Sequence, residues 1–449
     1  MKKLSNGVIR LRRALGIDFH LFATLLSRGW AMFAGAITAL LVPFWLTNIE
    51  QGYYFTLASL LGLQILFDLG LGQVIIQIVG HEVAHLDQSE IGVLSGSEHH
   101  IERLASLMQW LRRWYLIAAI IFAVIVGLAG AYFLWSKGQL PYEDWLPIWI
   151  VLVAATAVNL TYVPVLALHE GLGHIGHIAR LRMRQSMLGY GILWLVLVCN
   201  FGLWASCIVP VVSMIFTGIW VRRVGRTGNW LCARTVHASN ALNWSNDIFP
   251  FQWRIGLSAI SGYFIFYAFT PLIFARRGPA EAGQFGLAMA IFSALSALGA
   301  SWTYVKTPSF SMHIARGERK QLNKLFLATL YRSFLFTLAS ATAMVLLVLL
   351  MIQMNISQVN RISEPSVLVC LAVVCVANSI IFSVAAYMRA HREEPMLPVS
   401  LVGALLTILV AYFCSPYGVF TMSIFYALVT LLVLLPWSLI LFFFYFRRP

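Results

Sequence analysis

Apolar residues fill this chain in long blocks, without the alternation of a strand or the one-sided stripe of a soluble helix. Blocks of about 20 residues, the length that crosses a roughly 30 Å hydrocarbon core, follow one another from Leu21 to Phe446. The pattern predicts an all-α polytopic membrane protein. Its twelve transmembrane helices are expected at 21–46, 53–79, 114–134, 145–168, 184–200, 202–220, 249–274, 284–304, 328–351, 366–388, 397–413 and 418–446.

The second half of the chain repeats features of the first. Glu50 and Gly52 match Glu281 and Gly283 at one shift of 231 positions, in NIEQGYYFTLASLLGLQ and PAEAGQFGLAMAIFSAL. With small gaps allowed, Arg28 pairs with Arg254, and Pro43 pairs with Pro271. We therefore expect two parallel six-helix repeats, related by an axis along the membrane normal, with the substrate path between them. The proline kinks have either a packing or a gating role.

Three regions follow from this pattern. Residues 1–20 are basic, with apolar residues three and four apart, and predict a cytoplasmic amphipathic arm lying on the anionic membrane face. Residues 21–226 and 227–449 are expected to form the first and second six-helix bundles.

Composition and charge agree with a membrane protein. The chain is 60% hydrophobic and 11% charged, whereas soluble domains carry about 25% charged residues. The net charge of +14 needs no nucleic acid to explain it, because basic residues concentrate in cytoplasmic loops. With both termini inside, the outer loops hold only four Lys or Arg residues, namely Lys137, Arg276, Arg277 and Arg361.

The repeats, the basic arm, the segments EQGYY and EAGQF, and FDLGLGQ in the second helix together resemble the polysaccharide transport family. This family belongs to the multidrug/oligosaccharidyl-lipid/polysaccharide exporter superfamily and includes the Wzx-type O-antigen flippases. The resemblance implies a bacterial inner membrane protein that flips an undecaprenyl-pyrophosphate-linked oligosaccharide to the periplasmic leaflet by alternating access. Its partners would be this substrate, membrane lipids, and glycan polymerase and glycosyltransferase machinery.

Asp68 is the clearest candidate for a functional residue. It lies about twelve residues from the cytoplasmic end of the second helix, roughly 18 Å deep at 1.5 Å per residue. A charge at the bilayer centre costs roughly 2.5 to 3.5 kcal/mol on insertion scales, and the short side chain of Asp68 cannot reach the interface. Asp68 therefore either lines the cavity and couples transport to a cation or proton, or bonds a neighbouring helix.

Three cations are candidates for holding a pyrophosphate group. Arg28, Arg254 and Lys306 fall on helices expected to meet at the repeat interface, where arginines would grip phosphate oxygens bidentately and the lysine would act as a point charge. Arg28 could instead reach back to the membrane interface. Nearby aromatic residues either stack on sugar rings or form an interfacial belt; they are Trp253, Trp302 and Tyr304.

Two histidine-rich strings raise the question of metal binding. HEVAH, at 81–85, matches the zinc protease signature H-E-x-x-H. The longer metzincin form fails, because Gln88 and Ile91 stand where a glycine and the third histidine belong. A glutamate ligand further on, Glu90 or Glu102, is an alternative without a supporting motif. In HEGLGHIGH, His169 and His174 would not share a helix face, so we expect a solvated loop.

The sequence leaves three hypotheses for the function of this protein. The main hypothesis is the lipid-linked oligosaccharide flippase, and the alternative is a small-molecule or multidrug cation antiporter of the same superfamily. A membrane zinc metalloprotease is the third and least supported. We expect no enzyme activity, catalytic residue, cofactor or metal.

The topology is directly testable. Reporters fused after Pro449 and within 305–325 should read cytoplasmic, and one near Gly138 should read periplasmic, because these positions follow from twelve crossings with the N-terminus inside. An external C-terminus would contradict the count of twelve.

Overall fold

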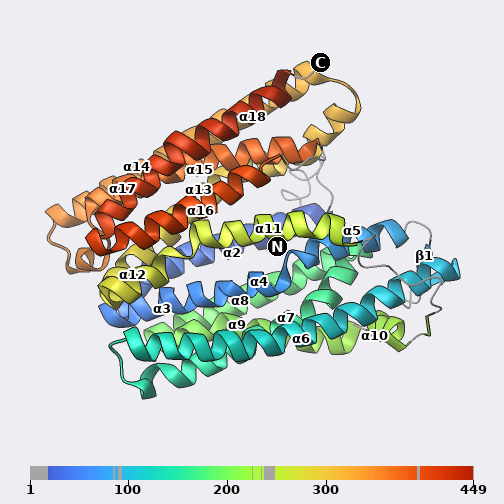
Figure 1. Cartoon of the computed structure of the whole chain (residues 1–449), viewed down its shortest axis with the longest axis horizontal. Helices are drawn as coiled ribbons and strands as arrows, with labels where there is room; N and C mark the ends of the chain where they lie inside the picture. The colour runs from blue at the N-terminus through green and yellow to red at the C-terminus, as the bar shows by residue number, and fades with distance from the viewer. Residues whose placement is uncertain are drawn as a thin grey trace, which may run out of the picture. The chain divides into compact units, whose positions relative to one another are not determined.

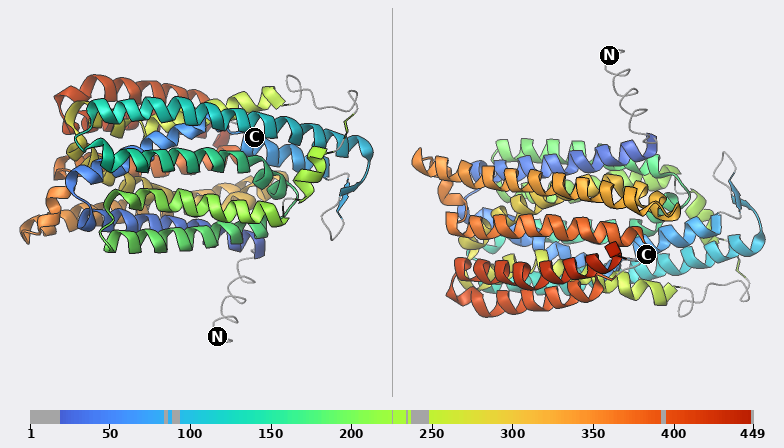
Figure 2. Two further views of the ribbon diagram at one scale, coloured as in Figure 1. Left: turned by 90° about the horizontal axis from the view of Figure 1, so that it is seen from below. Right: turned by 90° about the horizontal axis from the view of Figure 1, so that it is seen from above.

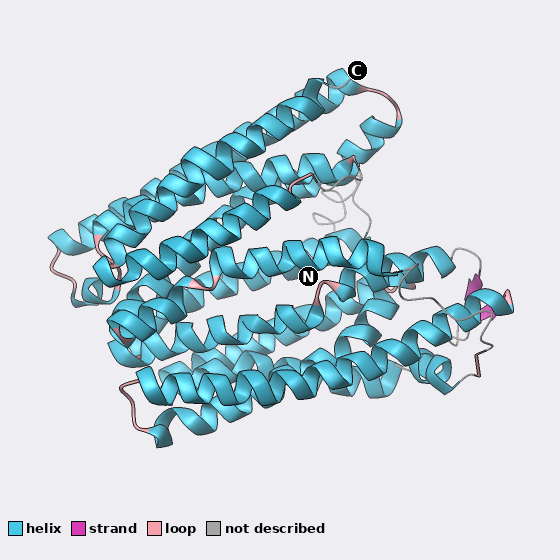
Figure 3. Cartoon of the chain, viewed as in Figure 1, coloured by secondary structure: helices cyan, strands magenta, loops and turns pink. Residues whose placement is uncertain are grey.

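The computed structural model describes residues 19–83, 86–88, 94–224, 226–233, 235–236, 248–391 and 395–447. Its described elements are almost all helices (Figures 1 and 3). They are α2 (Phe19–Trp45), α3 (Asn48–Leu61), α4 (Ile65–Asp68), α5 (Leu71–Val83), α6 (Glu98–Lys137), α7 (Tyr142–Gly171), α8 (Ile175–Val198), α9 (Ala205–Val224), α10 (Arg226–Ala233), α11 (Phe249–Phe266), α12 (Phe269–Arg277), α13 (Pro279–Ala315), α14 (Arg319–Gln353), α15 (Pro365–Ala390), α16 (Leu397–Cys414), α17 (Val419–Val429) and α18 (Leu435–Arg447).

Short elements complete the described chain. The strands β1 (Leu86–Gln88) and β2 (Leu94–Gly96) pair antiparallel. A π-helical turn, η7 (Thr430–Leu434), joins α17 to α18. Single-turn 3₁₀ helices are η1 (Gly62–Gln64), η2 (Gly202–Trp204), η5 (Ser357–Arg361) and η6 (Ser415–Tyr417).

The all-α polytopic fold is confirmed. Each predicted segment coincides with one helix or with consecutive helices. Among the described residues, nine helices are long and apolar enough to cross a membrane, and ten if the bent pair Asn48–Asp68 and Leu71–Val83 is one span. The exact count of twelve stays a prediction. The described apolar part of α2 is short, and α8 carries three arginines in its first half, Arg180, Arg182 and Arg184.

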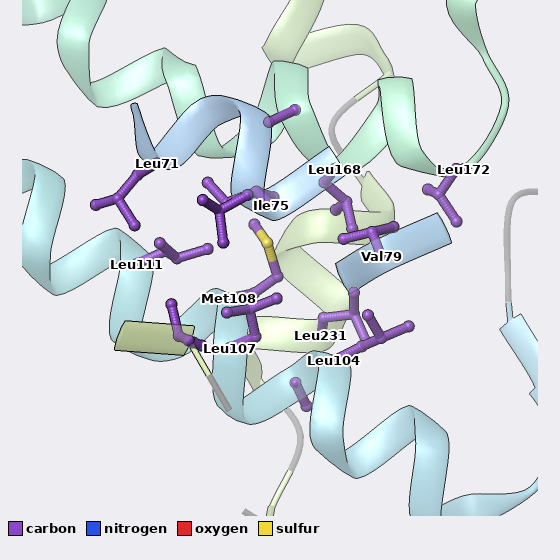
Figure 4. Close-up of a cluster of buried hydrophobic side chains, with 14 of the residues drawn as sticks. Leu71, Ile75, Val79, Leu104, Leu107, Met108, Leu111, Leu168, Leu172 and Leu231 are labelled. Atoms are coloured by element: carbon purple, nitrogen blue, oxygen red, sulfur yellow. The ribbon is translucent and has the colours of Figure 1, made fainter. Parts of the chain in front are cut away.

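Several helices are longer than their apolar blocks. The predicted third span starts at 114, but α6 starts at Glu98. The added turns place Leu104, Met108 and Leu111 on one face, where they are buried against α5 and α7 (Figure 4). Burial of this amphipathic face stabilises the extension. A search for apolar blocks alone misses it, because the other face is polar.

The described residues form two compact units. Unit 1 comprises the described parts of Met1–Thr38, Leu63–Tyr132 and Tyr142–Gly256. Unit 2 comprises the described parts of Ala39–Gly62, Phe133–Pro141 and Leu257–Pro449. The unit boundaries reflect contacts and do not test the predicted sequence boundaries, so the bundles 21–226 and 227–449 stay predictions. Most of the arm at 1–20 lies outside the described residues.

Unit 1 is centred on an apolar cluster. Leu71, Ile75 and Val79 of α5 face side chains of α6 and α7 (Figure 4). Leu231 of the short helix α10 joins the same cluster. The helices α7, α8 and α9 pack against one another and complete the bundle (Figure 2).

In unit 2, α13 is the central helix, packing against α3, α14 and α15. The aromatic cluster at its far end contains Phe310, Phe326 and Tyr387, with the rings of Phe326 and Tyr387 4.5 Å apart. Neighbouring membrane helices run alongside one another in this unit (Figure 2). Hydroxyl groups cross between these helices, as where Ser296 donates to the Cys375 carbonyl at 2.9 Å.

The repeated E-x-G segments meet each other inside unit 2. A Cβ on Gly283 would lie 2.6 Å from the Gly52 nitrogen, and a Cβ on Gly52 would lie 2.0 Å from the Pro279 carbonyl oxygen. Only glycine allows these backbones so close. Gln51, which is buried, fixes the crossing by donating from Nε2 to the carbonyls of Gly283 and Arg361, both at 3.0 Å. The duplicated motif is therefore a self-complementary helix contact.

Gly283→Ala should destabilise this crossing by about 1–3 kcal/mol, since the new methyl meets backbone that cannot rotate away. Gly262→Ala, on α11 of the same unit, is the matched control, because nothing lies within 4 Å of its added Cβ. Thermal unfolding in detergent should show a lower Tm for Gly283→Ala only. Equal Tm values for the two variants would contradict the close contact between Gly52 and Gly283.

Candidate functional site

Asp68 ends α4 at a break in a membrane helix. Leu69 follows in the left-handed conformation with φ 49°, and Gly70 has φ 68°, before α5 begins at Leu71. A left-handed non-glycine residue is strained and persists where surrounding contacts hold it. Here the second turn of α11 does so, because a Cβ on Gly70 would lie 2.5 Å from Ile255 Cγ2, and one on Gly256 would lie 2.9 Å from the Leu69 carbonyl oxygen.

The Asp68 carboxyl group has defined partners in unit 1. Tyr115 of α6 donates its hydroxyl to Asp68 Oδ1 at 2.6 Å. The backbone of Gly70 forms a second hydrogen bond with the carboxyl group. Tyr115 is fully buried and Asp68 is partly buried. The helix break thus presents a carboxylate that accepts from Tyr115 and from the Gly70 backbone, and its remaining lone pairs can accept a proton or a cation.

The predicted basic residues occupy different places. Arg254 is exposed in unit 1, on the turn of α11 that packs against the helix break, and its Cζ lies 5.5 Å from the Trp253 ring centre. Trp253 is also exposed. Arg28 lies on α2, but its side chain falls outside the described residues. A shared phosphate site for these groups stays a prediction.

The remaining predicted site residues lie on α13 in unit 2. Lys306 is partly buried, whereas Trp302 and Tyr304 are exposed. Spaced two and four residues apart on one long helix, they cannot all point in one direction. Their proposed contact with sugar also stays a prediction.

Glu82 of HEVAH is engaged in a buried charge cluster rather than left available as a base. His100 Nδ1 lies 2.6 Å from one carboxylate oxygen, and Arg103 Nε donates to the other at 3.0 Å. Glu82 is 4% exposed, whereas His81 is exposed. His85 lies outside the described residues. The histidine and arginine of α6 thus orient the glutamate to join α5 to α6 instead of facing a metal.

The expected solvated loop at HEGLGHIGH is wrong for its first histidine. His169 is 1% exposed, and its Nδ1 lies 3.2 Å from His174 Nδ1. A turn at Leu172–His174 folds the two rings together, which continuous helical geometry would prevent. Burial, and then the charge of neighbouring His177, lower the pKa of His174. The lowered pKa favours the neutral imidazole of His174, which can share a hydrogen bond with His169.

Metal binding finds no further support in the described chain. No group of three or more His, Cys, Asp or Glu residues with metal-ligand geometry occurs among the residues that the structure describes. The absence of a metal site therefore stays a prediction, since His85 and Glu90 fall outside them.

Comparison with solved structures identifies the fold. A MATE-family multidrug resistance transporter of the MOP superfamily, in an inward-facing conformation, is 16% identical and covers 91% of this chain and 98% of its own, with a TM-score of 0.63. An outward-facing MATE transporter is 15% identical, covers 95% of each chain and has a TM-score of 0.56. A MOP superfamily transporter from Pyrococcus furiosus is 15% identical, covers 95% and 96%, and has a TM-score of 0.54.

No family model and no curated protein sequence matches the chain. The similarity is therefore one of fold across nearly the whole length. This chain is a multi-pass membrane protein with the fold of the MATE transporters of the MOP superfamily.

Glu82→Gln should lower stability by about 1–3 kcal/mol, because one charge-assisted acceptor is lost beneath His100 and Arg103. Glu143→Gln, an exposed first-turn carboxylate of α7, should be nearly neutral. Thermal unfolding measures the stability of both variants.

A zinc analysis of the purified protein tests the protease hypothesis. Stoichiometric zinc would restore that hypothesis if a His81→Ala, His85→Ala double variant lost both the zinc and peptide cleavage.

Proposed function

We propose that this chain is a membrane transporter that works by alternating access and couples transport to a proton or cation at Asp68. The observation that carries this proposal is a carboxylate at a broken membrane helix. Helix breaks inside membranes are tolerated where protein buries the freed backbone groups or where those groups line a cavity, and transporters use such breaks to build binding sites. The fold supports the proposal, because the solved neighbours are transporters described in inward-facing and outward-facing conformations.

The bond from Tyr115 gives the coupling step a physical form. With Asp68 ionised, the hydroxyl donates to a carboxylate oxygen, which is a strong charge-assisted bond. Protonation of Asp68 removes the charge and weakens that bond. The position of α4 against α6 then depends on the occupancy of the carboxyl group, which is the differential interaction that a population shift between conformations requires.

Small molecules are the substrate class that the comparisons favour, and export is the corresponding activity. Two solved neighbours are described as multidrug resistance transporters. For such a substrate, Asp68 would also be the counter-ion for a cation. The fold alone does not set the charge of the substrate, since the Pyrococcus furiosus transporter is described as having a binding pocket of reverse polarity.

A lipid-linked oligosaccharide is the second candidate, because a cation, Arg254, lies beside the helix break. Arg254 is exposed one residue before the Ile255–Gly256 turn that packs on Leu69–Gly70. An exposed arginine beside an exposed tryptophan suits a phosphate bearing a sugar. This reading keeps the predicted roles of Arg28, Arg254 and Lys306, and a bacterial inner membrane with both termini in the cytoplasm.

Asp68→Asn tests the coupling step. Asparagine retains an oxygen that accepts from Tyr115 but loses the titratable charge, so a structural role survives the change and a coupling role does not. In proteoliposomes, Asp68→Asn should reduce transport driven by a pH or cation gradient at least tenfold with unchanged thermal stability. Tyr115→Phe should give a smaller loss, and Glu143→Gln none. Full gradient-driven transport by Asp68→Asn would refute the proposal.

Two transport assays in the same vesicles, one with each substrate, distinguish the two candidate functions. A cationic dye should be exported if the first candidate holds, and a lipid-linked oligosaccharide should be flipped if the second does. In the oligosaccharide arm, Arg28→Ala and Arg254→Ala should each reduce flipping strongly, and Arg254→Lys should rescue only partly, because bidentate contact is lost. Normal flipping by both alanine variants would leave these arginines as interfacial anchors.

A further inference from the structure

A polar pocket of about 280 Å³ lies within unit 2, where three membrane helices begin. The helices are α13, α15 and α17, which start at Pro279, Pro365 and Val419. Its polar lining side chains are Arg277, Glu281, Gln284, Ser363 and Glu364. The first turn of α17 closes the pocket with Gly418, Val419 and Phe420. This pocket is separate from Asp68, which belongs to unit 1.

The starts of the apolar spans indicate that the pocket lies at the level of the lipid headgroups. The three apolar spans Pro279–Ile314, Pro365–Ala390 and Val419–Phe446 all start at it. The nearby end of α16 carries exposed aromatic side chains of the kind that mark membrane interfaces, including Tyr412 and Phe413. Arg276 holds this end, donating from Nη1 to the Tyr412 carbonyl at 2.9 Å with its Cζ 4.4 Å from the Tyr412 ring centre.

Charges of both signs face the pocket. The first turn of α17 supplies backbone N–H groups without intrahelical partners and the positive end of the helix dipole. Arg277 adds a cation, whose Nε donates to Glu281 at 3.0 Å. Glu281 and Glu364 add two carboxylates. An isolated anion would meet these carboxylates, and an isolated cation would meet Arg277 and the helix end.

One buried polar atom at the pocket has no partner in the described structure. Ser363 is 5% exposed, and its Oγ makes no hydrogen bond with the described residues. A buried hydroxyl without a partner is costly, so such groups normally bond to a ligand or water. Gln284 donates from Nε2 to the Asn360 carbonyl at 2.8 Å, which turns its amide toward the pocket with acceptor capacity remaining.

We propose that this pocket binds the zwitterionic headgroup of a phospholipid that joins a phosphate to a primary amine, as in phosphatidylethanolamine. The phosphate is held by the first turn of α17 and Arg277, and Ser363 donates its hydroxyl to a phosphate oxygen. The ammonium donates to Glu364 and to the free oxygen of Glu281. Acyl chains extend into the bilayer beside the helices. A quaternary choline group lacks the N–H donors that the two carboxylates require.

The headgroup series tests the pocket in the unmodified chain. The full-length protein in nanodiscs would be analysed by native mass spectrometry with phosphatidylethanolamine, its mono- and dimethyl forms, phosphatidylcholine and phosphatidylglycerol. Retention should fall stepwise with methylation and be at least fivefold lower for phosphatidylcholine and phosphatidylglycerol than for phosphatidylethanolamine. Equal retention of all five lipids, or preference for phosphatidylglycerol, would overturn the proposal.

A charge variant gives an independent readout. Glu364→Gln should lower the ratio of retained phosphatidylethanolamine to phosphatidylglycerol at least fivefold, because the ammonium loses the negative charge of its acceptor and an anion loses a repelling charge. Ser363→Ala should weaken both lipids together. The matched control is Glu143→Gln, an exposed first-turn carboxylate in unit 1. An unchanged ratio in Glu364→Gln with an unaltered Tm would refute the assignment.

A competition experiment with a water-soluble headgroup distinguishes a lipid ligand from a free zwitterion. Glycerophosphoethanolamine carries the same charged groups without acyl chains. It should compete with bound phosphatidylethanolamine at least a hundredfold more weakly than the lipid itself, since it lacks the bilayer anchoring of the chains. Competition at equal concentrations would overturn the assignment to a lipid.

Discussion

Hydrocarbon cannot hydrogen-bond the backbone, and this constraint governs the whole described structure. Every membrane segment must satisfy its own N–H and C=O groups, so the chain is built of helices. A break is tolerated only where protein covers the freed groups. The break at Leu69–Gly70 meets this condition, since Ile255 and Gly256 pack directly on it. The same break orients Asp68 toward Tyr115, so a candidate coupling site arises from a backbone requirement.

The same physics explains the close helix contacts. Apolar side chains gain little by leaving lipid for another helix, so membrane helices associate through small residues and interhelical hydrogen bonds. The crossing of α3 and α13 has both features, with glycine against glycine at Gly52 and Gly283 and two hydrogen bonds from Gln51. The duplicated segment thereby acquires a structural meaning: each copy supplies one side of the contact. The described repeat motif is thus part of the scaffold of unit 2.

Charged groups near the helix ends follow a different rule, because water and headgroups are within reach. Glu82 joins α5 to α6 through His100 and Arg103, so a string with the spacing of a zinc motif serves a packing role. At the pocket in unit 2, Glu364 is exposed, and Arg277 is exposed although its Nε donates to Glu281. Charge that remains available at the interface is what a zwitterionic headgroup requires, whereas charge deep in the membrane, as at Asp68, requires a partner from the protein.

The sequence alone determined the fold class, the places of the helices and the duplicated motif. It also indicated Asp68 as a candidate functional residue. Block length and the cost of a buried charge are local properties, and they can be read along the chain. Tertiary structure decided the rest. Nothing near Asp68 in sequence indicates Tyr115, which is 47 positions away. The burial of His169 depends on a turn that brings two rings together. The extension of α6 depends on an apolar face that is buried against α5, α7 and α10. These features are contacts between distant segments, so their energies depend on packing that no single stretch of sequence encodes.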